Sequence, residues 1–321
     1  MQSNLFKDYR FLAILSQFMI RPRFYLPLLL TLLCLSCKNY RRAGLGFGDF
    51  KGIHFIEVKR VYINGLQFNN HGYQLEPLWK LSFVSDDSVN VFSPKNKRYY
   101  GFHVYWDHDS IFNMVDAWFK LKKLTADSIV VQALRVEEKV IKDDDEGSKV
   151  VLTFYSDKYI KSQYPKKIQA MGLPGKKDTA FIRKRIAETS AKPDSSFAAR
   201  EPVMLKSISP LIKVEKVEHK STPIDKVDPS ETYLEPEYNI TIHKAYEAFS
   251  YIMYVYVDEK GKMTFRNSVV PLMPEFKDSY EQIMRGIVNG YLMHYLDITP
   301  GKTLGIPHTT YILLNVVGKA N

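Results

Sequence analysis

Cysteine is nearly absent from this chain of 321 residues: it has two, Cys34 and Cys37, both near the amino terminus. From residue 38 onward there is no thiol, which excludes intramolecular disulfides and thiolate metal sites from that part of the chain. The folded part must therefore be stabilised by packing. The 45% of hydrophobic and 13% of aromatic residues are sufficient for buried cores.

Recognisable catalytic motifs are absent as well, since the chain has no Gly-x-Ser-x-Gly, His-Glu-x-x-His or Ser-x-x-Lys pattern. Asp107-His108-Asp109 suggests a metal or acid–base cluster, but adjacent polar residues between strands are typical of a turn. We interpret Asp143–Gly147 as a solvated hairpin tip, with weak calcium binding as the alternative. We predict a protein that is not an enzyme and has no catalytic residue, no cofactor and no metal.

The net charge of +10 is concentrated in two segments. Residues 1–37 carry Lys or Arg at four positions against one Asp, and residues 161–230 carry 15 Lys and Arg against 8 Asp and Glu. The other residues are neutral in sum, so no globular part is expected to have a basic face. Because nucleic-acid binding depends on such a face, we predict that the chain binds neither DNA nor RNA.

An apolar segment near the amino terminus indicates where the protein is located. Residues 26–37 are almost entirely apolar, Arg21 and Arg23 precede them, and polar residues follow Cys37. The run is shorter than the roughly 20 residues of a membrane-spanning helix, and its order of basic, apolar and small residues is that of a secretory signal. Residues 1–37 therefore resemble a bacterial lipoprotein signal peptide, with Met19 as a candidate for the true start.

This resemblance implies that Cys37 is acylated and that the mature chain is anchored in the cell envelope. Lys38, directly after the cysteine, resembles a signal for sorting to the outer membrane, with the protein facing the periplasm. A signal anchor that is never cleaved is the alternative. Residues 38–49, which include the glycine-rich stretch Gly44–Gly48, are expected to form a flexible tether next to the lipid.

Residues 50–156 contain short runs of alternating polar and apolar side chains, the pattern of half-buried antiparallel strands. Turn clusters separate the runs roughly every 10 residues, which predicts a meander that closes into a barrel or packs as a sandwich. The expected strands are residues 53–63, 79–84, 89–92, 98–106, 111–121, 128–139 and 150–155.

Two passages of this region, Trp79–Phe92 and Trp118–Val131, resemble the lipocalin-like domains of bacterial lipoproteins. The resemblance implies an antiparallel β barrel over residues 50–156. It also suggests an alternative function, the carriage of a hydrophobic small molecule inside the barrel. A small barrel filled by its own side chains is the opposing possibility.

Residues 157–230 are rich in Lys and contain seven prolines. Repeated proline disfavours long helices and central strands, so we expect a mostly extended linker. One or two helical turns are predicted at Asp178–Thr189, where apolar residues recur at helical spacing. A strand at Pro210–Val217 is expected to dock on the next domain.

Residues 231–321 are predicted to form a second domain, of the α+β class. The expected elements are a hairpin around Gly261, an amphipathic helix and a final strand: Tyr251–Val257, Met263–Val270, Lys277–Leu296 and Thr309–Val317. The segments Val255–Met263 and Tyr295–Pro307 resemble motifs of the TonB C-terminal domain, which implies a ββαβ fold.

These observations favour a function in binding. The TonB resemblance implies that the C-terminal domain binds a periplasmic protein or an extended peptide by adding a strand to its sheet edge, in TonB-related transport. The alternatives are a carrier of a hydrophobic small molecule and a structural envelope tether, whose Lys-rich linker contacts anionic lipid headgroups or cell-wall polymer. The candidate edge residues lie in the final strand: Tyr311, Ile312, Leu313, Leu314 and Asn315.

Overall fold

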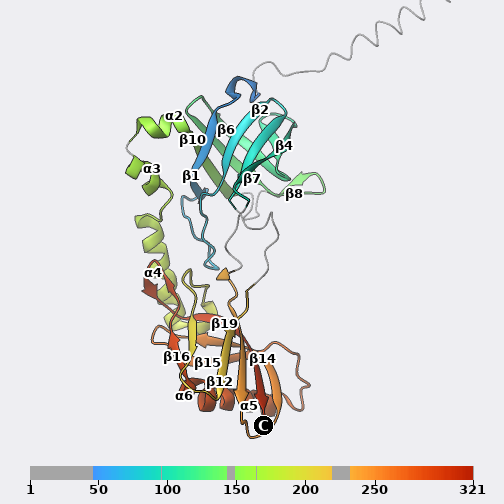
Figure 1. The fold of residues 1–321 in the computed structure, drawn as a ribbon, viewed down its shortest axis with the longest axis vertical. Helices are drawn as coiled ribbons and strands as arrows, with labels where there is room; N and C mark the ends of the chain where they lie inside the picture. Colours follow the sequence, from blue (N-terminus) through green and yellow to red (C-terminus); the bar gives the residue numbers. More distant parts are fainter. Residues whose placement is uncertain (1–45, 95, 143–148, 164, 219–231, 321) are drawn as a thin grey trace, which may run out of the picture. The chain divides into compact units, whose positions relative to one another are not determined.

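A closed barrel of eight antiparallel strands forms the first part of the fold (Figure 1). The computed structural model describes residues 46–94, 96–142, 149–163, 165–218 and 232–320. The strand order is β1-β10-β7-β6-β5-β4-β3-β2, and pairing of β1 with β2 closes the barrel. The strands are β1 (His54–Tyr62), β2 (Lys80–Ser85), β3 (Ser88–Ser93), β4 (Arg98–Trp106), β5 (Ile111–Met114), β6 (Ala117–Leu124), β7 (Ser128–Leu134) and β10 (Val150–Ser156). The predicted antiparallel β barrel is confirmed, and it is compatible with a lipocalin-like domain.

The expected strand over residues 111–121 is divided by a tight turn between β5 and β6. Val115 and Asp116 at this turn have φ angles of 54° and 58°. Two successive positive φ angles define a type I′ hairpin turn, which is usually formed by Asn-Gly or Asp-Gly. A β-branched residue rarely adopts this conformation, so the sequence contains no turn signal at Val115. A separate two-stranded ladder follows, made of β8 (Val136–Glu137) and β9 (Val140–Ile141).

Phe47 packs into the barrel core, although residues 38–49 were expected to be a flexible tether. Its side chain is fully buried, and its ring stacks on Phe83 with 3.9 Å between centroids. The neighbouring glycine Gly48 begins the short helix η2 (Gly48–Phe50), and its N–H donates to Oδ1 of Asp86 at 2.7 Å. A Cβ atom on Gly46 would lie 2.3 Å from the same oxygen, so a larger residue here would displace the Asp86 side chain from this hydrogen bond. The expectation of a flexible tether is therefore wrong for residues 46–49.

Residues 157–218 are not the mostly extended linker that was expected. They form α2 (Asp157–Ser162), α3 (Pro165–Met171), α4 (Lys176–Ala191), η4 (Pro193–Ser195), β11 (Met204–Ser207) and β12 (Ile212–Lys216). Proline does not prevent these helices because Pro165 and Pro193 occupy first positions, where no backbone N–H is needed. The helical turns predicted at Asp178–Thr189 belong to the longer α4, and the strand predicted at Pro210–Val217 contains β12.

The connection between β1 and β2 packs against α4 and the segment that follows it. Phe68 of this connection shares a small buried cluster with Ile182 and Phe197. The N–H of Ala198 donates to the carbonyl of His71 at 3.0 Å. The buried carboxylate of Asp178, near the start of α4, accepts the N–H of Gln67 at 2.7 Å. Residues 46–321 form one compact unit.

The C-terminal part is a five-stranded sheet of order β12-β13-β19-β14-β15 (Figure 1). Its further strands are β13 (Glu237–His243), β14 (Phe249–Val257), β15 (Met263–Ser268) and β19 (Thr310–Lys319). Gly261 lies in the β14–β15 turn with φ 82°, and a Cβ atom there would lie 2.6 Å from the carbonyl of Ile298.

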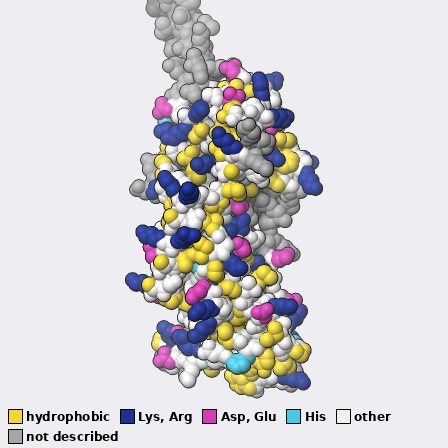
Figure 2. All heavy atoms as spheres, turned by 90° about the vertical axis from the view of Figure 1, so that its left-hand side faces the viewer, with side chains coloured by type: hydrophobic (Ala, Val, Ile, Leu, Met, Phe, Trp, Pro, Cys, Tyr) yellow, Lys and Arg dark blue, Asp and Glu magenta, His cyan; other side chains and the backbone are white. Residues whose placement is uncertain are grey.

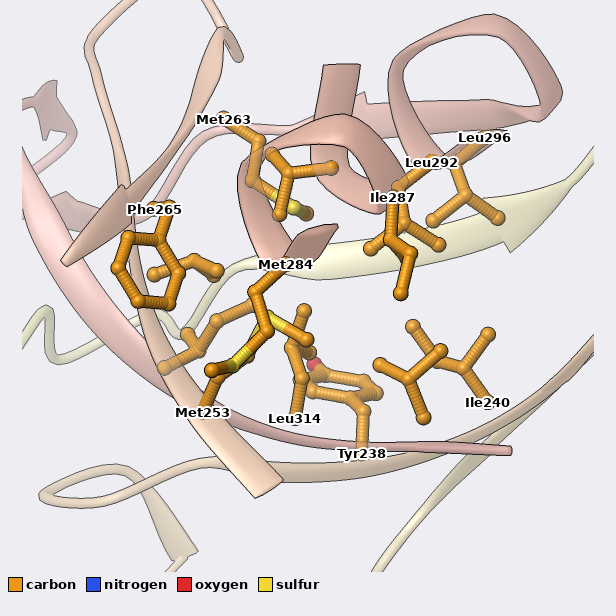
Figure 3. Packing of buried hydrophobic residues seen from close by; sticks show 14 of the residues in the cluster. Tyr238, Ile240, Met253, Met263, Phe265, Met284, Ile287, Leu292, Leu296 and Leu314 are labelled. Carbon is orange, nitrogen blue, oxygen red and sulfur yellow. The ribbon is translucent and has the colours of Figure 1, made fainter. Parts of the chain in front are cut away.

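A helical segment packs on one face of this sheet. It consists of α5 (Lys277–Ile287), a π-helical turn η7 (Val288–Leu292) and α6 (Met293–Tyr295). Figure 3 shows Met284 and Ile287 of α5 pointing toward Met253, Leu314 and Tyr238 of the sheet, all in one buried cluster. The strands between α6 and β19 are β16 (Leu296–Thr299), which pairs with β11, and the short pair β17 (Lys302–Thr303) and β18 (Ile306–Pro307).

Candidate functional site

The candidate edge residues Tyr311–Asn315 lie in the centre of the sheet. β19 pairs in parallel with β13, where Leu314 faces Tyr238, and antiparallel with β14, where Leu314 faces Met253. The expectation of an edge is wrong because β13 was not predicted. Since the main-chain groups of β19 are engaged by a neighbour on each side, this strand cannot accept an added peptide strand.

The two outer strands of the described sheet are β12 and β15, and they differ in how their edges are protected. β12 carries Lys213 and Glu215, which form an exposed ion pair at 2.8 Å. Charged side chains on an edge strand disfavour pairing with another chain. The single charged side chain of β15 is Arg266, which is half-buried against tyrosine rings, and the exposed side chains of this strand are Thr264 and Asn267. The edge of β15 is therefore the less protected one.

Exposed apolar side chains follow β15 directly in the chain. The side chains of Val270 and Met273 are 51% and 69% exposed. Exposed apolar side chains that follow one another closely are a feature of contact surfaces. We call β15 together with Val269, Val270 and Met273 the β15 surface.

At the start of β15 the backbone is already held by α6. The N–H of Met263 donates to Sδ of Met293 at 3.2 Å. This contact fixes the strand end against the helical segment. It also shows that the N–H of Met263 points away from β14, toward the outer side of the strand.

A concave region lies between the barrel and the β1–β2 connection, an open cavity of about 390 Å³. The barrel interior is filled by apolar side chains, including Phe55, Phe112 and Phe154. The cavity is thus an open recess next to the packed barrel interior. The cavity is lined by Arg60, Tyr62, Asn69, Tyr73, Leu75, Trp79, Ala117, Phe119, Ala133, Val150 and Leu152.

The polar cluster at residues 107–109 has the geometry of a turn. Nδ1 of His108 lies 2.8 Å from Oδ2 of Asp107, both side chains are more than half exposed, and Asp109 has φ 53°. Over the part of the chain that the structure describes, no three His, Cys, Asp or Glu side chains gather as a metal site would require. Cys37, Met19 and Asp143–Gly147 lie outside the described residues.

His308 is a buried titratable residue that the sequence analysis missed. Its Nδ1–H donates to the carbonyl of Thr309 at 3.0 Å, and Nε2 accepts the hydroxyl of Thr303 at 2.9 Å. Its ring stacks on Phe197 with 4.1 Å between centroids. Burial lowers the pKa of His308 from 6.5 to about 4, so the ring is neutral near pH 7. Neutral, hydrogen-bonded and enclosed, His308 has a structural role.

Basic side chains are dispersed on the face shown in Figure 2, where Lys and Arg are scattered among hydrophobic and other polar groups. None of the described helices is both long enough and apolar enough to cross a bilayer. No family model matches this chain, and no curated protein matches it.

Proposed function

We propose that this chain is a non-enzymatic lipoprotein of the cell envelope that binds an extended segment of a periplasmic partner. In this proposal acylated Cys37 anchors the protein, with the outer membrane as its site. The resemblance of the C-terminal region to the TonB C-terminal domain supports partner binding by strand addition, in TonB-related transport.

The observation that carries the proposal is the β15 surface. An incoming strand gains main-chain hydrogen bonds at a sheet edge, and side-chain pockets beside that edge give selectivity. β15 offers such an edge without acidic side chains, and Val270 and Met273 offer exposed apolar contacts beyond its end. The binding strand is therefore β15 and not the central β19.

Peptide selection on the purified full chain tests this proposal. A phage library of random dodecapeptides is selected for binding, and the selected peptides are measured against two variants. Val270→Asp combined with Met273→Asp should weaken binding about ten-fold or more, because charge replaces apolar contact surface. Met204→Asp is the matched control, since Met204 is 65% exposed outside the β15 surface. An equal loss of peptide affinity in the Asp double variant and in the control, or no loss in either, would reject the β15 surface as the binding site.

The barrel cavity favours a second candidate function, the carriage of a hydrophobic small molecule. A cavity of about 390 Å³ lies in the size range of small-molecule sites, and most of its lining is apolar or aromatic. The resemblance to lipocalin-like domains supports the same idea. This function is compatible with peptide binding, because the cavity lining and the β15 surface share no residue.

Native mass spectrometry of the full chain after incubation with envelope lipid extract tests the carrier function. We expect a bound apolar molecule on the wild type and its loss on Ala117→Phe, which adds a ring to the cavity wall. Ala187→Phe, on exposed helix surface, serves as the control. A wild-type spectrum without any bound molecule would contradict the carrier function and leave the peptide-binding proposal intact.

A further inference from the structure

Arg266 of β15 lies against three tyrosine rings on the sheet face opposite α5. Val255 of β14 belongs to the core under α5, so the alternating Tyr254 and Tyr256 project to the other face. The guanidinium carbon of Arg266 lies 5.9 Å from the ring centroid of Tyr254, 5.3 Å from that of Tyr256 and 5.0 Å from that of Tyr311. The cation is thus held by the electron-rich faces of three rings.

The other half-buried arginines among the described residues are also stacked on aromatic rings, and each of these has a carboxylate partner. The ion pairs are Arg60–Glu57 at 2.7 Å, Arg185–Glu188 at 2.5 Å and Arg200–Glu76 at 3.0 Å. The rings beneath them are Trp79, Phe197 and Tyr233. Within the described residues, Arg266 forms no ion pair and donates no hydrogen bond. Carboxylates lie near the site but none pairs directly with the guanidinium, so this partly desolvated cation is free to pair with an anion from outside the chain.

Two tyrosine hydroxyls add hydrogen-bond donors to this site. Burial first, and then the negative charge of Glu235, raises the pKa of Tyr254 and of Tyr311, so both hydroxyls stay protonated at neutral pH. Neither hydroxyl has a hydrogen-bond partner in the described structure. The hydroxyl of Tyr256 is engaged, because it donates to Oδ1 of Asp194 at 2.5 Å. The guanidinium and the two free hydroxyls form a set of donors without an acceptor.

The surroundings of the site limit the charge that it can accept. Asp194 lies beside Tyr256, and Glu235 acts on both Tyr254 and Tyr311. These carboxylates repel a doubly charged phosphate more strongly than a singly charged carboxylate. A planar carboxylate also matches the fork of the guanidinium with two parallel hydrogen bonds.

We infer that Arg266, supported by Tyr254 and Tyr311, binds an acidic side chain of the peptide that adds to β15. The inference rests on the proposed function, because Arg266 belongs to the strand at which the peptide pairs. Side chains of an added strand that point to this face lie next to Arg266. The preferred partner segment is therefore an extended acidic peptide, and not merely an apolar one.

The peptides selected on the full chain provide the test. Asp and Glu should be enriched among binders selected on the wild type relative to the starting library, and the enrichment should disappear on Arg266→Gln. Replacing the selected acidic residue by its amide should weaken binding to the wild type about ten-fold or more, the effect of one charge-assisted pair. The same replacement should have little effect on the affinity for Arg266→Gln.

Arg285→Gln is the matched control, since Arg285 stacks on Phe265 of β15 at 4.7 Å and already pairs with Glu281 at 3.3 Å. This variant should keep the acidic preference. Binders without enrichment in Asp and Glu, or an enrichment that survives Arg266→Gln, would overturn the acidic-peptide inference and leave strand addition standing. A library that yields no binders would overturn both. Displacement of acidic peptides by millimolar phosphate but not by acetate would contradict the preference for a carboxylate.

Discussion

The barrel and the five-stranded sheet of this protein differ in whether their outer strands are paired. In the barrel each strand has two neighbours, because β1 pairs with both β10 and β2. The C-terminal sheet is open and ends in β12 and β15. Closure leaves no main-chain groups for a partner, so the barrel can bind only through its cavity or outer surface, whereas the sheet can bind through its backbone. The difference assigns the two candidate functions to separate regions of one chain.

The largest expected effect is that of proline in the centre of the open sheet. Ile312→Pro should destabilise the protein by about 5 kcal/mol or more, because it removes a buried side chain and a ladder hydrogen bond. Ile312→Val, the control, should cost about 1 kcal/mol. Urea unfolding followed by circular dichroism measures both. A proline variant as stable as the valine variant would contradict the central position of β19.

Removal of the Phe47 ring from the barrel core should have the next largest effect on stability. Phe47→Ala should destabilise the barrel by about 3–5 kcal/mol, the usual cost of deleting a buried phenylalanine. The three tryptophans, Trp79, Trp106 and Trp118, all lie in the barrel or at its edge, so tryptophan fluorescence reports on this part. Phe50→Ala, at a half-buried position, should cost less. If the unfolding transition of Phe47→Ala were the same as that of the wild type, residues 46–49 would be a flexible tether and not part of the barrel core.

Acid should weaken the structure around His308. The folded pKa of about 4 lies below the ordinary 6.5, so the unfolded chain binds more protons between these values. The stabilisation is present above pH 6.5 and is lost as the pH falls toward 4, by about 3 kcal/mol in total. Unfolding free energies of the wild type and of His308→Gln, measured between these pH values, should converge as the pH falls. Parallel profiles would contradict a buried neutral imidazole.

The smallest expected effect on stability is that of Arg266→Gln. Cation–π contacts at partly exposed sites contribute about 1 kcal/mol or less. Arg60→Gln should cost more, because it leaves the carboxylate of Glu57, which is 5% exposed, without its cation. Urea unfolding compares the two variants. A larger loss of unfolding free energy for Arg266→Gln than for Arg60→Gln would mean that Arg266 stabilises the fold and does not bind a ligand.

The sequence predicted the barrel because period-two alternation is a local pattern that each strand carries by itself. It did not reveal the turn at Val115, where the backbone adopts a conformation that valine rarely takes. The prolines of residues 157–230 were expected to disfavour helices. Pro165 and Pro193, however, stand at positions where helices begin. These errors come from rules that describe residue types and not positions within an element.

The site was harder to predict because it depends on the order of strands. Glu237–His243 alternates polar and apolar residues, so β13 had a usable signal. Without β13, β19 was placed at the edge. The site around Arg266 combines side chains of β14, β15 and β19, and no local pattern in the sequence shows that these strands are neighbours.

Hydrogen–deuterium exchange of the full chain, with and without a selected peptide, tests most directly whether β15 receives the partner. Strand addition there should slow exchange in residues 263–268, while residues 212–216 of β12 and 310–319 of β19 exchange as before. Protection confined to β12, or absent from β15 while the peptide is bound, would contradict binding at the β15 edge.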